Sequence, residues 1–109
     1  AVLRRAPDGE DTPDELRAGP VALSPGGRTV KVDGRGVSLT YKEFELLYCL
    51  MRNQGIVLSR DALLDQVWGF DYGGESRTVD MHIKALRQKL GAAGALIQTV
   101  RSVGYKMEG

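Results

Sequence analysis

The chain has 109 residues, of which 42% are hydrophobic, and a formal net charge of +1 at pH 7. This length suits one small domain with a single modest core. No apolar run approaches about 18 residues, so we expect no transmembrane helix and no membrane partner, and we find no signal-peptide pattern.

Cysteine and histidine are too few for metal or disulfide chemistry. Cys49 lies in the apolar stretch 44–51, which has helical spacing, and is expected to be a small core residue. With one cysteine and one histidine, the chain lacks the ligand spacing of a metal site, and we expect no cofactor. This composition fits a reducing, cytoplasmic environment.

Positive charge gathers in the last third of the chain. Six cations and one acid, Asp80, lie between Arg77 and Lys106, whereas residues 1–20 hold three cations and five acids. A local field of this kind attracts a polyanion even when the whole chain is nearly neutral.

Residues 1–18 are predicted to lie outside the folded domain. Residues 6–15 have two prolines, an acidic bias and no periodicity, as linkers do. Residues 1–5, Ala-Val-Leu-Arg-Arg, are apolar and then basic, like the last turn of a helix from a preceding domain. We therefore place the domain at residues 19–109.

Three short runs of alternating apolar residues predict an antiparallel meander within residues 19–39. The turns are Ser-Pro-Gly-Gly at 24–27 and Asp-Gly at 33–34, which is a strong hairpin signal. Three strands alone are marginally stable, so this sheet should pack on the helices that follow. The alternating residues are Val21 and Leu23, Val30 and Val32, and Val37 and Leu39.

Two helices are predicted next from their start signals. Thr40 and Glu43 form a T-x-x-E capping box, and the helix they begin should end near Gly55. Ser59 is a plausible N-cap for a second helix that ends at Trp68 and Gly69.

The segment 70–75, Phe-Asp-Tyr-Gly-Gly-Glu, is predicted to be a loop. Two interpretations are about equally supported. The segment is either a plain connector or a protein-contact loop, since exposed aromatic rings are costly to leave in water.

Residues 76–90 form the helix around which the chain is organised. An apolar stripe runs along one side of it, and two cations, an amide and a methionine lie opposite. A core can anchor such a helix while its outer face meets a partner, and the major groove of DNA admits an α-helix. The alternative is an ordinary amphipathic helix with solvated charges. The stripe is Val79, Ile83, Leu86 and Leu90; the outer face is Arg77, Met81, Lys84 and Gln88, flanked by Thr78 and Ala85.

Gly91 should end this helix, whose N-cap is predicted at Ser76 or Glu75. Residues 96–100 and 105–107 then read as two strands around a turn at 101–104. The resulting order is helix, turn, helix, wing.

With these elements assigned, the chain resembles the DNA-binding effector domain of OmpR/PhoB-type response regulators over roughly residues 19–107. The resemblance implies an α+β fold: a winged helix-turn-helix with an N-terminal antiparallel sheet of four strands, three helices and a C-terminal β-hairpin. The fourth strand would lie within 19–39 or be short. The matching segments are Leu39-Thr40 with 43–47, Leu58-Ser59-Arg60 with Leu63 and Val67-Trp68-Gly69, 77–83 with Leu86-Arg87, and Thr99-Val100-Arg101 with Gly104-Tyr105.

By this resemblance, residues 76–90 enter the major groove of double-stranded DNA, and a wing at about 97–107 enters the minor groove. Asp80 would accept a hydrogen bond from cytosine, Met81 would touch a thymine methyl, and Lys84 would reach phosphate or guanine. Ala85 stands where some relatives carry a base-reading arginine. Arg101 would read the minor groove, although a solvated turn charge is its alternative.

The resemblance also implies phosphate contacts along both elements. His82 has the alternative of a local hydrogen bond, and Trp68 that of a core residue. The implied phosphate contacts are Trp68, Arg77, Thr78, His82, Arg87, Thr99 and Tyr105.

The implied partners extend beyond DNA. Residues 1–18 would be the end of a receiver domain plus a linker, with a cognate sensor histidine kinase acting through that receiver. The domain would be a monomer alone and a head-to-tail tandem dimer on direct-repeat half-sites. The loop that would contact RNA polymerase comprises Phe70, Asp71, Tyr72, Gly73, Gly74 and Glu75.

Two other classes of function are weaker. A winged-helix protein-interaction module would suit the aromatic loop but not the cationic cluster. An enzyme would need Asp80 and His82 to act together, and these point about 200° apart on a helix. We therefore expect a bacterial transcription regulator with no catalytic activity.

Overall fold

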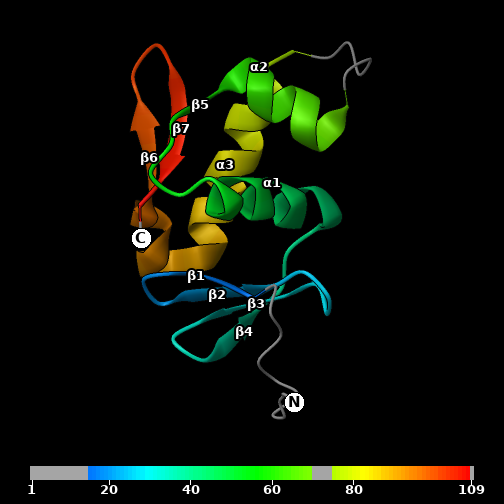
Figure 1. Cartoon of the computed structure of the whole chain (residues 1–109), viewed down its shortest axis with the longest axis vertical. Coiled ribbons are helices and arrows are strands. Elements are labelled where there is room, and N and C mark those ends of the chain that lie inside the picture. Colours follow the sequence, from blue (N-terminus) through cyan, green and yellow to red (C-terminus); the bar gives the residue numbers. More distant parts are fainter. Residues whose placement is uncertain (1–14, 70–74, 109) are drawn as a thin grey trace, which may run out of the picture.

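The computed structural model describes residues 15–69 and 75–108 (Figure 1). An N-terminal sheet lies on one side of the helices, and a second sheet runs alongside them (Figure 1). This is the predicted class of fold: antiparallel sheet, three helices, C-terminal hairpin. The elements are β1 Leu16–Ala18, β2 Val21–Ser24, β3 Thr29–Val32, β4 Arg35–Val37, α1 Tyr41–Arg52, β5 Leu58–Ser59, α2 Arg60–Leu63, α3 Arg77–Leu90, β6 Ile97–Val100 and β7 Gly104–Met107.

The N-terminal sheet has the order β1-β2-β3-β4, and neighbouring strands are antiparallel. Its first strand lies outside the range 19–39 in which we sought a fourth strand, and it extends the sheet into the segment assigned to a linker. Three residues with a central arginine are too few to show alternation. Leu16 nevertheless pairs with Leu23, and Ala18 is buried. Residues 1–14 of that assignment lie outside the described residues.

The capping box predicted for α1 is confirmed in both directions. The Glu43 amide donates to Thr40 Oγ1 at 3.2 Å, and the Thr40 amide donates to Glu43 Oε1 at 2.9 Å. Lys89 Nζ also lies 2.6 Å from Glu43 Oε1, which ties α1 to the end of α3. Burial raises the pKa of Glu43, but the bonds from Lys89 and Thr40 outweigh it and hold the pKa below its ordinary value.

The second helix is short, and it passes from α-helical to π-helical geometry. Ser59 Oγ accepts from the Ala62 amide at 3.0 Å, so the predicted cap is confirmed. After four α-helical residues the chain continues as a π-helical turn, Leu64–Trp68. Gly69, with φ of +108°, ends it as predicted. The loop predicted at 70–75 lies outside the described residues except for Glu75.

The stripe predicted for α3 is confirmed: Val79, Ile83, Leu86 and Leu90 are each at most 3% exposed. They belong to one core with residues of α1 and of both sheets. The N-cap is Ser76, one of the two residues predicted, although its backbone is helical and its side chain makes no capping bond. No helix among the described residues is long and apolar enough to cross a membrane.

Candidate nucleic-acid interface

The outer face of α3 carries exposed side chains of the predicted kinds. Arg77, Met81, Lys84 and Gln88 are all exposed, and Thr78 and Ala85 are half-buried beside them. Met81 is 62% exposed, a large apolar side chain left in water on an otherwise cationic face. A helix anchored by its opposite side can present this face to a partner without rearranging.

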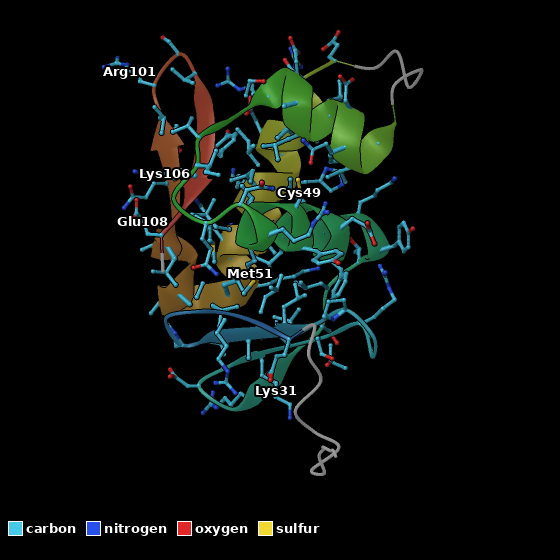
Figure 2. All side chains as sticks on the ribbon, viewed as in Figure 1. Lys31, Cys49, Met51, Arg101, Lys106 and Glu108 are labelled. Atoms are coloured by element: carbon cyan, nitrogen blue, oxygen red, sulfur yellow. The ribbon has the colours of Figure 1, made fainter. Side chains whose placement is uncertain are left out.

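The hairpin β6–β7 forms the predicted wing. Thr99 pairs with Tyr105, and the Val103 amide donates to Val100 O at 2.9 Å across the turn. Figure 2 shows Arg101 at the tip of the hairpin, extending away from the body of the domain. Arg101 is exposed.

One side chain of α3 ties this helix to the first wing strand. Arg87 Nη2 donates to Ile97 O at 2.6 Å and to Thr99 Oγ1 at 2.8 Å, and Arg87 Nε donates to Ile97 O at 3.1 Å. Two residues predicted to contact phosphate, Arg87 and Thr99, are thus bonded to each other. They form a single polar site at the base of the wing.

A second tie joins α3 to the other wing strand. Asp80 Oδ1 accepts from Arg60 Nε at 2.8 Å and from the Tyr105 hydroxyl at 2.5 Å. Burial raises the pKa of Asp80, but the bonds from Tyr105 and Arg60 hold it below its ordinary value. Burial and Asp80 together raise the pKa of Tyr105. Tyr105 is only 5% exposed, so its predicted phosphate contact gains no support from its position.

His82 and Trp68 lie together beside the outer face. Their ring centroids are 4.8 Å apart in an edge-to-face arrangement. His82 Nδ1 lies 2.9 Å from Thr78 O, which is the local hydrogen bond given above as its alternative role. Trp68 is half-buried and packs on the core, so its body serves the fold whatever its N–H contacts.

The structure therefore brings most of the predicted residues onto two adjoining elements. Asp80, Met81, Lys84 and Ala85 share α3, and Arg101 projects from the wing. Residues 70–74 lie outside the described part, and Glu75 is exposed with its carboxylate 3.6 Å from Arg77 Nε. Arg60 was missed as a site residue, because a contact with Asp80 twenty residues later leaves no local pattern.

Comparisons with known proteins show which family the chain is similar to. A family model described as transcriptional regulatory protein, C terminal, matches residues 34–107. The sensory transduction protein RegX3 of Mycolicibacterium smegmatis is 46% identical over 115 residues, which is 100% of this chain and 50% of that protein. The chain thus spans about half the length of such relatives.

Two solved DNA-binding domains have similar structures. The Klebsiella pneumoniae RstA DNA-binding domain in complex with the RstA box is 35% identical, with a TM-score of 0.76 over 86% of this chain and 96% of that one. The DNA-binding domain of CpxR from E. coli is 36% identical, with a TM-score of 0.76 over 87% and 96%.

Proposed function

The chain belongs to the family of C-terminal DNA-binding domains of transcriptional regulatory proteins, the effector domains of OmpR/PhoB-type response regulators, and we propose how its surface recognises DNA. In this proposal α3 enters the major groove and the wing enters the neighbouring minor groove. The observation that carries it is the two-sided character of α3. A buried stripe holds the helix against the core, and the opposite face is exposed.

Base recognition falls to residues 80–85 of α3 in this proposal. Met81 meets a thymine methyl, and Lys84 reaches a guanine edge or a phosphate. Asp80 accepts from a cytosine amino group. Ala85, with its small side chain, lets the groove floor come close without forming a hydrogen bond. Arg101 supplies the minor-groove contact, favoured where A·T pairs narrow the groove.

Phosphate contacts flank those base contacts. Arg77 and Thr78 lie in the first turn of α3, where backbone amides and the helix dipole also favour an anion. Arg87 and Thr99 form the polar site at the wing base, and His82 lies with Trp68 beside the helix. These contacts would set position rather than sequence preference.

The partners of the whole protein belong to the same proposal. RstA is similar to this chain and was solved on its own DNA box. We infer that two copies of this domain bind direct-repeat half-sites head to tail in the cytoplasm, and that the 70–75 loop contacts RNA polymerase. A preceding receiver, addressed by a sensor histidine kinase, would control the pairing.

The test is selection from a pool of random duplex DNA at two salt concentrations, followed by sequencing. We expect a motif repeated at about one helical turn and retention that falls steeply with salt because phosphate contacts release counterions. Enrichment of single, unpaired sites would contradict the proposal that two copies bind in tandem. No retention at low salt would instead favour the protein-interaction module.

A further inference from the structure

Three side chains from three elements meet at one carboxylate oxygen. Arg60 begins α2, Asp80 lies in the first turn of α3, and Tyr105 lies in β7. Both the guanidinium and the phenol donate to Asp80 Oδ1. The guanidinium carbon of Arg60 also lies 6.0 Å from the centre of the Tyr105 ring, so the three groups form one cluster.

The cluster holds only one of the two carboxylate oxygens. Among the described residues no hydrogen bond reaches Asp80 Oδ2, and the side chain is 41% exposed. A carboxylate turns readily about its last torsion. Two donors on Oδ1, anchored in different elements, remove that freedom and leave Oδ2 available in a fixed orientation.

The same donors make an acid tolerable beside DNA. An isolated carboxylate is repelled by phosphates, but Arg60 places a positive charge against Asp80. The bonds from Tyr105 and Arg60 hold the pKa of Asp80 below its ordinary value, and the carboxyl is ionised at neutral pH. An ionised carboxylate only accepts hydrogen bonds, so it favours the cytosine amino group and disfavours the acceptor edges of guanine.

We propose that Arg60 and Tyr105 are positioning residues for base selection, acting through Asp80 rather than on DNA themselves. This inference rests on the proposed function and deepens it. It gives Tyr105 a different role from the phosphate contact implied by resemblance, because its hydroxyl is committed to Asp80 and its side chain is buried.

The experiment compares Tyr105→Phe, Asp80→Ala and the double variant on the selected duplex and on duplexes substituted one base pair at a time. Tyr105→Phe keeps the ring and removes only the hydroxyl. The matched control is Tyr48→Phe, which removes a hydroxyl from a half-buried tyrosine of α1. Arg60→Lys is a further variant that keeps the charge and removes the Nε donor. Circular dichroism and melting temperature check that each variant folds.

We expect Asp80→Ala to identify one base pair at which discrimination is lost. Tyr105→Phe should lower discrimination at that same pair by about tenfold, with affinity for random DNA unchanged. Arg60→Lys should act at that pair as well. The double variant should lose no more than Asp80→Ala alone, because the hydroxyl acts through the carboxylate.

Three results would separate the alternatives. A loss that is equal on every duplex, and that adds to Asp80→Ala, would make Tyr105 a phosphate contact and overturn the inference. Full discrimination in both Tyr105→Phe and Arg60→Lys would also overturn it while leaving the proposed function intact. Failure of the unaltered domain to select any motif would overturn the proposed function, and this inference with it.

Discussion

The sheet β1–β4 and the sheet β5-β7-β6 belong to the same core but are assembled differently. In the first, neighbours in space are neighbours in sequence, and buried Val21, Leu23 and Val30 hold it. In the second, β5 pairs with a strand made far later, and Asp80 and Arg87 of α3 fix the hairpin by hydrogen bonds. Apolar contact is non-directional, whereas hydrogen bonds are directional. The wing is therefore held to α3 by directional bonds in addition to its buried apolar residues Ile97 and Met107.

The largest expected loss of stability comes from disrupting the core that both sheets share. Val79→Asp places a charge in the fully buried stripe of α3, with no partner there. We expect a loss of more than about 4 kcal/mol in the free energy of unfolding, enough to unfold a small domain. Thermal melting followed by circular dichroism measures it. An unchanged melting temperature would show that the stripe is misplaced.

A glycine in each sheet gives a matched comparison of the two regions. A Cβ on Gly104 of β7 would lie 1.9 Å from Leu58 O of β5, whereas one on Gly36 of β4 would meet nothing within 4 Å. Gly104→Ala must push β5 and β7 apart, and we expect it to cost about 3 kcal/mol. Gly36→Ala should stay within about 1 kcal/mol of the original. Urea titration of both variants tests this, and equal losses would contradict it.

The stability contributed by the ion pair between Glu43 of α1 and Lys89 of α3 should depend on pH. The pKa of Glu43 is lowered from 4.5 in the folded domain, so its contribution is present above pH 4.5 and is lost as pH falls through the folded value. Glu43→Gln should cost about 1 kcal/mol at pH 7 and flatten the acid limb of a stability profile. The control is Glu45→Gln, which removes an ion pair with the exposed Arg28. If the stability of Glu43→Gln fell with decreasing pH as steeply as that of the original domain, the Glu43 carboxylate would not be the source of the acid sensitivity.

The smallest effect on stability should come from the wing tip. Arg101→Ala removes an exposed side chain, so we expect less than about 0.5 kcal/mol of change in unfolding. DNA binding should nevertheless weaken, most on sites with A·T-rich flanks. Binding titrations on duplexes with A·T-rich and G·C-rich flanks measure this. Equal loss on both would remove the minor-groove assignment.

Local signals made most of the fold predictable. The hairpins, the Thr40 capping box and the α3 stripe each depend on residues a few positions apart, and all were confirmed. β1 was not predicted, because Leu-Arg-Ala is too short to show a period. β5 was not predicted, because its pairing with Tyr105 leaves no nearby trace.

The candidate site was predictable in its surface but not in its connections. Helical spacing alone separated the outer face of α3 from the buried one. It carried no information that Arg60, Asp80 and Tyr105 meet, because their contacts span twenty or more positions and depend on how three elements dock. The roles of individual residues toward DNA remain predictions.

The pairing of β5 with β7 also sets the order in which the domain becomes complete during synthesis. Strands β1–β4 pair only with one another within the described sheets, so their pairing requires no strand made later in the chain. Leu58 and Asp80 must wait until Gly104 and Tyr105 have been made. The half that would meet DNA is thus finished last, and a chain halted before Gly104 lacks both the strand that pairs with β5 and the tyrosine that donates to Asp80.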